Sequence, residues 1–144
     1  MPHARTIVER RWKSHPGNVH YARVAFREAI LPYVRDEIDL IELAIGEACA
    51  NAIEHGSPEG TANSFTVRCS FEPEWRAIVI EVVDEGAAFD FSSMVPGNAP
   101  DLTSEGGRGL FLIHQIMDEV ALQQVAQGMM VRMVKHVSKW PGDV

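Results

Sequence analysis

The run Ala77–Val83 constrains the fold of this chain more than any other segment. Its sequence is AIVIEVV, so every position except Glu81 is apolar. A strand that is apolar on both faces must be covered on both faces, which is typical of the middle of a sheet. The chain turns directly afterwards, at Asp84-Glu85-Gly86. The sequence therefore predicts a layered domain with this strand near its centre.

The segments around this run predict further strands. Phe65–Phe71 alternates apolar and polar residues, as a half-buried strand does. The short turn Glu72–Glu74 joins it to the central run, which predicts an antiparallel hairpin. Three other strands are predicted towards the ends of the chain: Thr6–Trp12, Val120–Val125 and Met130–Val137.

Helices are predicted where apolar residues recur at helical spacing. They run from about Val19 to Pro32, from a cap at Asp36 to Gly56, and from about Arg108 to Glu119. With the strands they predict an α+β fold, a two-layer sandwich. Its sheet is mixed, mostly antiparallel and four- or five-stranded, with three helices on one face. The length of 144 residues fits a single domain over residues 1–144, with its core at about 6–137.

Charge and hydropathy exclude several classes of function. The net charge of −7, with 13 Lys and Arg spread along the chain, argues against a nucleic-acid partner. No apolar run approaches the roughly 20 residues of a membrane span, and no signal core is present, so we expect a cytoplasmic protein without membrane contact. The same acidity means that a phosphate ligand needs a divalent cation and backbone N–H donors. Cys49 and Cys69 lack metal-ligand spacing and are expected to be buried, reduced thiols.

Glu47, Asn51 and His55 are expected on one face of the second predicted helix. They are four residues apart, so successive members drift by only about 40° around the helix axis. A carboxylate, a carboxamide and an imidazole in one row suit a general base, a metal ligand and an orienting group. An ordinary polar helix face carries the same residue types, so this row is not specific by itself.

Asp84 and Gly86 follow the central strand directly. A carboxylate at that point can face a cleft while the chain turns sharply at the glycine. It can then accept a hydrogen bond from an amine, such as the exocyclic amine of adenine. A simple strand-ending turn is the alternative.

The glycine run Gly106–Gly109 precedes the third predicted helix. Flexible glycines ahead of free helix N–H groups form an anion site. No Gly-Lys-Ser/Thr follows, so the run is not a P-loop, and Leu112 stands where a dinucleotide fingerprint needs glycine. A flexible hinge before a helix is the alternative.

In this order the three motifs resemble the GHKL (Bergerat-fold) ATPase superfamily, shared by gyrase, histidine kinases and the MutL mismatch-repair protein. Residues 47–56 (EACANAIEHG) resemble its N box, residues 84–90 (DEGAAFD) its G1 box and residues 107–113 (GRGLFLI) its G2 box. The pattern DxGxxFD, then GxGLFLI, then Met117–Val120 is most similar to the bacterial anti-sigma-factor serine/threonine protein kinases. The resemblance covers about residues 6–137.

The resemblance implies an enzyme that uses ATP and Mg²⁺. It gives Glu47 the role of base towards a serine hydroxyl, Asn51 that of Mg²⁺ ligand, and Asp84 that of acceptor for the adenine amine. The nucleotide contacts fall on the motif residues Asn51, His55, Asp84, Gly86, Phe89, Gly106, Gly107, Arg108, Gly109 and Leu110.

The resemblance also implies partners. The kinase phosphorylates a serine of an anti-anti-sigma antagonist of the STAS type and sequesters a sigma factor or similar regulator, as a homodimer. Gly128-Met129 stands where the family often has Gly-Thr, with the threonine near adenine. This departure keeps a second hypothesis open, a module that sequesters a partner, with or without nucleotide, and has no kinase activity. A gyrase-type clamp is disfavoured because the sequence shows no transducer domain.

Overall fold

The computed structural model describes residues 5–86, 105–126 and 128–137, and of residues 105–108 it describes the backbone alone. In chain order the elements are β1 (Arg5–Lys13), α1 (Asn18–Ile30), α2 (Ile38–Glu54), the short 3₁₀ helix η1 (Gly60–Ala62), β2 (Ser64–Glu72), β3 (Ala77–Val83), α3 (Glu105–Ile116), β4 (Glu119–Val125) and β5 (Gly128–His136).

The sheet has five strands in the order β1-β2-β3-β5-β4. β3 is the middle strand, as its apolar run predicted. Val83, at its end, pairs with Thr66 of β2 on one side and with Met130 of β5 on the other. The predicted α+β fold is confirmed. The sheet is not mixed, however, since each neighbouring pair of described strands is antiparallel.

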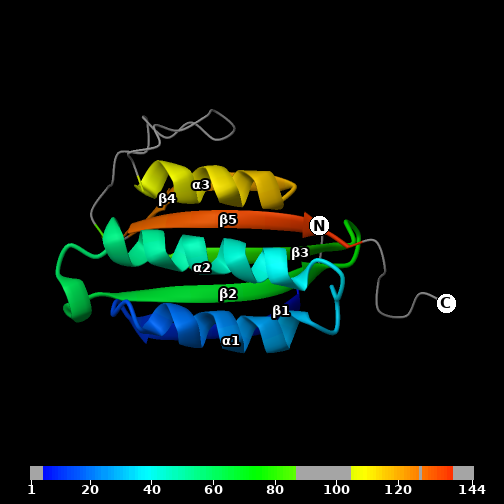
Figure 1. Cartoon of the computed structure of the whole chain (residues 1–144), viewed down its shortest axis with the longest axis horizontal. Coiled ribbons are helices and arrows are strands. Elements are labelled where there is room, and N and C mark those ends of the chain that lie inside the picture. The colour runs from blue at the N-terminus through cyan, green and yellow to red at the C-terminus, as the bar shows by residue number, and fades with distance from the viewer. Residues whose placement is uncertain (1–4, 87–104, 127, 138–144) are drawn as a thin grey trace.

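The three helices lie side by side over one face of the sheet (Figure 1). α2 runs opposite to α1 and α3, so the C-terminal end of α2 lies beside the N-terminal end of α3. None of the helices in the described ranges combines the length and the hydropathy that a membrane crossing requires.

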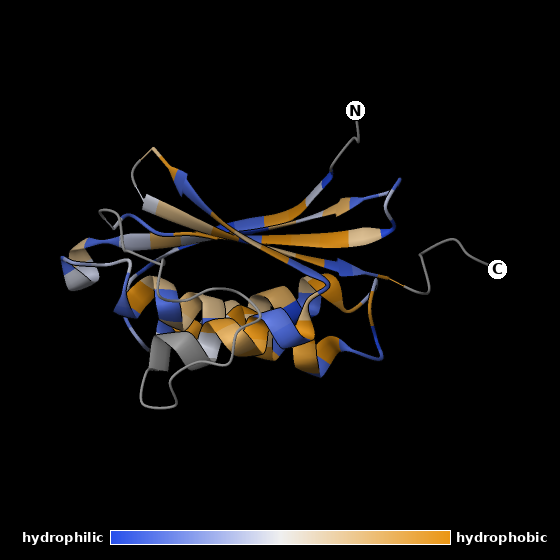
Figure 2. Ribbon diagram, turned by 90° about the horizontal axis from the view of Figure 1, so that it is seen from above, coloured by the Kyte–Doolittle hydropathy of each residue, from blue (hydrophilic) through white to orange (hydrophobic). Residues whose placement is uncertain are grey.

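The core fills the space between the helices and the sheet. Figure 2 shows apolar segments of both layers facing each other there. The largest buried side chains include Phe26 of α1, Ile45 of α2, Ile80 of β3 and Ile113 of α3. Burying one such side chain contributes about 1.5–3 kcal/mol, so this contact between layers is the main source of stability.

Trp12 connects the edge strand β1 to this core. Its ring centroid lies 6.1 Å from that of Phe26 and 5.9 Å from that of Phe65. Both phenylalanines are fully buried, and Trp12 packs against the core from β1. The aromatic cluster thus ties β1, α1 and β2 together.

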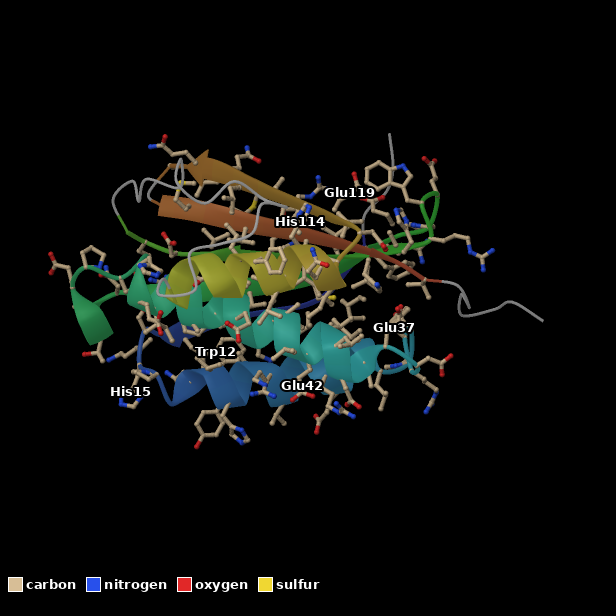
Figure 3. All side chains as sticks on the ribbon, turned by 45° about the horizontal axis from the view of Figure 1, so that its top comes forward. Trp12, His15, Glu37, Glu42, His114 and Glu119 are labelled. Carbon is tan, nitrogen blue, oxygen red and sulfur yellow. The ribbon has the colours of Figure 1, made fainter. Side chains whose placement is uncertain are left out.

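Charged side chains align α1 with α2 at the surface. Arg27 Nη1 lies 2.6 Å from both Asp39 Oδ1 and Glu42 Oε2, and Arg23 Nε lies 3.4 Å from Glu42 Oε1. In Figure 3, Glu42 lies on the side of α2 that faces α1. Exposed ion pairs contribute little to stability, so these contacts fix the orientation of the helices more than their association.

The predicted cap at Asp36 is wrong. α2 begins at Ile38, and its N-cap is Glu37, whose side chain makes no capping hydrogen bond. The turns that follow α1 continue through Asp36, and the N–H of Ile38 reaches back to the carbonyl of Arg35 at 3.5 Å. The helix therefore starts one residue later than a cap at Asp36 would place it.

Two other boundaries moved. Glu72 stays in β2 because it pairs with Ala77, so the hairpin turn spans residues 73–76, where Arg76 has a positive φ of 49°. The third helix ends at Ile116 rather than near Glu119, because Glu119 already pairs with Val134 in the sheet.

Phe26→Ala is expected to lower the free energy of unfolding by about 3–5 kcal/mol, because the truncation leaves a cavity beneath Trp12. Leu40→Ala is the control, since Leu40 is 51% exposed on α2. It should change stability by less than about 1 kcal/mol. Urea denaturation followed by circular dichroism measures both variants, and equal effects would contradict the placement of Phe26 in the core.

Candidate functional site

Asp84 is held at the end of β3 by the backbone of two other segments. It is only 8% exposed. Its backbone N–H donates to the carbonyl of Met129 at 3.0 Å. Its Oδ1 accepts hydrogen bonds from the N–H groups of Gly86 and Met129, both at 3.0 Å. The carboxylate is therefore fixed through one oxygen, and these bonds leave Oδ2 unused.

Glycines from three segments surround this carboxylate. They are Gly56 after α2, Gly86 after β3 and Gly128 at the start of β5. A Cβ on Gly56 would overlap the Asp84 side chain, and one on Gly128 would lie 2.6 Å from Asp84 Oδ1. A Cβ on Gly86 would lie 2.7 Å from the carbonyl oxygen of Gly56. The three segments can converge on Asp84 only because none of them carries a side chain at these points.

Burial raises the pKa of Asp84 above its ordinary value of 3.8. The N–H groups of Met129 and Gly86 stabilise the charged form and oppose this shift only in part. A carboxylate whose charged form lacks solvation gains from any further donor. A ligand amine or amide that reaches Asp84 would supply one.

A second meeting point joins α2 to α3. A Cβ on Gly109 would lie 2.9 Å from Glu47 Oε2 and 3.5 Å from Asn51 Oδ1. Asn51 is buried and Glu47 is half-buried. The first N–H groups of α3, which starts at Glu105, have no partner within the helix and carry a partial positive charge. Glu47 and Asn51 thus lie within one turn of an electropositive helix end.

The oxygen atoms of Glu47 and Asn51 suit a hard cation. In the described ranges, no group of three or more His, Cys, Asp and Glu side chains is arranged to hold a metal. Mg²⁺ needs fewer protein ligands, since one or two side-chain oxygens commonly hold it together with phosphates and water. Asn51 Oδ1 therefore fits a magnesium ion that binds together with a phosphate ligand, and the Glu47 carboxylate lies beside it.

His55 and Leu110 are placed differently from the other predicted contacts. His55 is the C-cap of α2, with its N–H 2.9 Å from the carbonyl oxygen of Asn51, and it leads directly into Gly56. Its side chain is half-buried. Leu110 is 2% exposed, so its side chain packs inside the protein and only its backbone is suited to face a ligand.

The glycine run does not precede the third helix. Gly106–Gly109 lie inside α3, which begins at Glu105. The first turn needs no N–H partners within the helix, so glycines cost only backbone entropy there. Phe89 lies outside the described residues, and so does the side chain of Arg108.

Several residues of this site escaped the sequence analysis as functional positions. Gly56 was predicted only to end a helix, and Gly128 was noted only as the residue before Met129. Met129 was noted for its side chain, whereas its backbone is what contacts Asp84. A glycine directly after a helix and another at the start of a strand were visible signals. Their closeness to Asp84 was not visible in the sequence, because these contacts join positions that are far apart along the chain.

Known proteins share the sequence of this chain over most of its length. A family model described as a histidine kinase-like ATPase domain matches residues 12–135. Serine-protein kinase RsbW of Bacillus subtilis (strain 168) is 36% identical over 114 residues, which are 74% of this chain and 69% of that protein. Serine-protein kinase RsbW of Staphylococcus aureus (strain JH9) is 32% identical over 111 residues, covering 72% of this chain and 69% of that protein.

A solved structure shares the fold. It contains the RsbU and RsbW domains of a Mycobacterium tuberculosis protein, and it matches 92% of this chain with a TM-score of 0.64. The match covers 32% of that longer chain at 15% sequence identity. At this identity the likeness supports the architecture alone.

The stability of the protein is expected to depend on the ionisation of Asp84. Because its folded pKa is raised above 3.8, the folded state binds more protons than the unfolded state between 3.8 and the folded pKa. This residue therefore lowers the free energy of unfolding as pH rises through that window. Asp84→Asn should gain stability relative to the wild type over the same window. Urea denaturation from about pH 3 to pH 7, with a ¹³C NMR titration of the Asp84 carboxyl, measures this linkage. A carboxyl that titrates at or below 3.8 would contradict it.

Proposed function

Because the chain belongs to the histidine kinase-like ATPase domain family, and within it to the RsbW serine-protein kinases, we propose that it binds Mg-ATP and phosphorylates a serine of a partner protein. The observation that carries the proposal is that α2 makes two close contacts, one with the end of β3 and one with the start of α3. Gly56 contacts Asp84 just beyond the helix, and Glu47 with Asn51 contacts Gly109. Glu47 and Gly56 are separated by roughly 13 Å along the helix direction, a span that suits an extended nucleotide.

Asp84 would recognise the base. Its Oδ1 is already held by two backbone N–H groups, and its burial favours a further donor such as the 6-amino group of adenine. Gly86 and Gly128 let the turn after β3 and the start of β5 pack directly against Asp84 and Gly56, because neither carries a side chain. Phe89 and His55, two further contacts predicted from the motifs, are proposed to line the base and ribose.

The start of α3 would hold the phosphates. The backbone from Gly106 to Leu110 would supply N–H donors, and Arg108 a positive charge. Asn51 would bind Mg²⁺ with its side-chain oxygen. The ion, when bound, neutralises phosphate charge, which matters in a protein with a net charge of −7.

Glu47 would act as the base. It lies half-buried beside Gly109, within one helical turn of the proposed magnesium ligand. A carboxylate there would orient the serine hydroxyl and accept its proton during transfer. The phosphoryl group would pass from ATP to that hydroxyl oxygen and leave ADP behind. Positioning and electrostatic stabilisation then account for most of the catalysis, as is usual for phosphoryl transfer.

The partner proposed for this reaction is an anti-anti-sigma antagonist of the STAS type. The kinase itself would sequester a sigma factor or similar regulator while the antagonist is phosphorylated. We propose that it does so as a homodimer in the cytoplasm. This proposal rests on family membership, since the RsbW relatives are named as serine-protein kinases.

The second candidate is a sequestering module without kinase activity. Met129 favours it, because the family often has threonine at this position. The contact between residue 129 and Asp84, however, runs through the backbone N–H, which any residue except proline supplies. The support of Asp84 is therefore insensitive to this substitution, and the kinase remains the better supported function.

Calorimetry with Mg-ATP and a phosphotransfer assay separate the two candidates. The kinase requires micromolar Mg-ATP binding, weakened at least about tenfold by Asp84→Asn through loss of the charged acceptor. It also requires transfer of the γ-phosphate to a serine of a STAS-type protein. A lack of ATP binding at millimolar concentration would favour a sequestering module without nucleotide. ATP binding without phosphate transfer to any of several STAS-type proteins would favour a sequestering module that holds nucleotide.

Glu47→Gln is expected to slow transfer by about 10²–10⁴-fold, because the amide cannot accept the serine proton. The dissociation constant for Mg-ATP should stay within about threefold of the wild-type value, since the shape of the side chain is kept. Asp39→Asn is the matched control on the same helix, where the Asp39 side chain is 86% exposed and pairs with Arg27 of α1. Loss of ATP binding in Glu47→Gln would instead assign Glu47 a structural role.

A further inference from the structure

Glu85, the neighbour of Asp84, bonds to two different strands. Its Oε1 accepts a hydrogen bond from the backbone N–H of Ser64 at 2.5 Å. Its Oε2 lies 2.8 Å from Nη2 of Arg11. The Glu85 side chain is 30% exposed, so the carboxylate is held at the border of the interior. One side chain thus connects the end of β3 to β1 and β2.

The bond to Ser64 replaces a bond of the β-ladder. Thr66 of β2 pairs with Val83 of β3, so the antiparallel register would place Ser64 opposite Glu85. β3 ends at Val83, although the backbone N–H of Asp84 still bonds to Met129, its in-register partner on β5. The carboxylate of Glu85 therefore satisfies a donor on β2 that the departing main chain leaves behind.

Asp84 and Glu85 extend from the chain in opposite directions. Val82 and Val67 belong to the core beneath the helices, so their neighbours Val83 and Thr66 face the other side of the sheet. Arg11 pairs with Thr66 and shares that side. Glu85 reaches Arg11 there, whereas Asp84 contacts Gly56 at the end of α2. Anchors on both sides fix the rotation of the strand end about its own axis.

We infer that Glu85 is a positioning residue for nucleotide recognition: it sets the direction in which Asp84 presents its carboxylate to the 6-position of a purine. The inference rests on the proposed function, because it assigns to Asp84 the recognition of the adenine amine. Glu85 itself need not touch the nucleotide. Arg11 contributes through Glu85, although its side chain is 64% exposed. The bond to the Ser64 N–H is the stronger anchor, because solvent screens it less.

The selectivity for the 6-amino group tests this role. Calorimetry measures the dissociation constants of the full chain for Mg-ATP and for the magnesium complex of purine riboside triphosphate, which lacks that amine. The wild type should prefer ATP. Glu85→Ala should reduce this preference about tenfold, since it removes both anchors, while binding of the amine-free nucleotide stays nearly constant. Glu85→Gln, which keeps an acceptor for the Ser64 N–H, and Arg11→Ala should each reduce it about threefold.

Glu81→Gln is the matched control. Glu81 lies on β3 on the same side of the sheet as Val83, and its partners in the strand register are Arg68 and Arg132 rather than Ser64 or Met129. Its nucleotide preference should equal that of the wild type. Thermal unfolding of each variant identifies folding defects. If Glu85→Ala does not fold or binds neither nucleotide, the preferences of Glu85→Gln and Arg11→Ala decide the question.

The outcomes distinguish a failure of the proposed function from a failure of the inference about Glu85. A wild type that binds no ATP overturns the proposed function and the inference with it. A wild type that prefers ATP, with an unchanged preference in the Glu85 and Arg11 variants, overturns the inference alone. Equal weakening of both nucleotides in these variants makes Glu85 a structural residue and overturns it as well.

Discussion

The buried carboxylate of Asp84 is the interaction on which the site depends. A charge taken out of water needs donors, and here the N–H groups of Gly86 and Met129 supply them. Those donors come from the turn after β3 and from β5, while Gly56 brings the end of α2 against the same side chain. Satisfying one carboxylate therefore joins the central strand, its neighbour and the middle helix at one end of the molecule.

The contact between α2 and α3 is the second constraint. Gly109 allows α3 to approach until its backbone meets Glu47 and Asn51. Both side chains come from one helix, so their relative position is fixed by helical geometry and not by loops. The proposed site thus has a base-recognition end built on the sheet and a phosphate end built on two helix termini. α2, which carries residues for both ends, sets the distance between them.

Sequence patterns predicted much of this arrangement, for local reasons. The apolar run of β3 identified the central strand because only a strand covered on both faces has that composition. The four-residue spacing from Glu47 to Asn51 placed both side chains on one face of their helix because helical periodicity does not depend on context. The predictions that failed were those of a mixed sheet and of helix boundaries. Asp36 does not cap α2, and Gly106–Gly109 lie within α3 instead of before it. Such boundaries follow from packing of the neighbouring turns, which a single sequence does not display.

By itself, the sequence determined the α+β class, the central strand, the family motifs and the side chains that are proposed to carry the chemistry. These properties depend on residue type and on spacings within one helix or strand. Only the tertiary structure decided that Gly56 and Gly128 make room for Asp84, that residue 129 acts through its backbone, and that Glu85 links β3 to Ser64 and Arg11. These contacts join residues up to 74 positions apart. They exist because close packing leaves each buried polar group only a few possible hydrogen-bond partners. The path of the chain through the fold determines which partners these are.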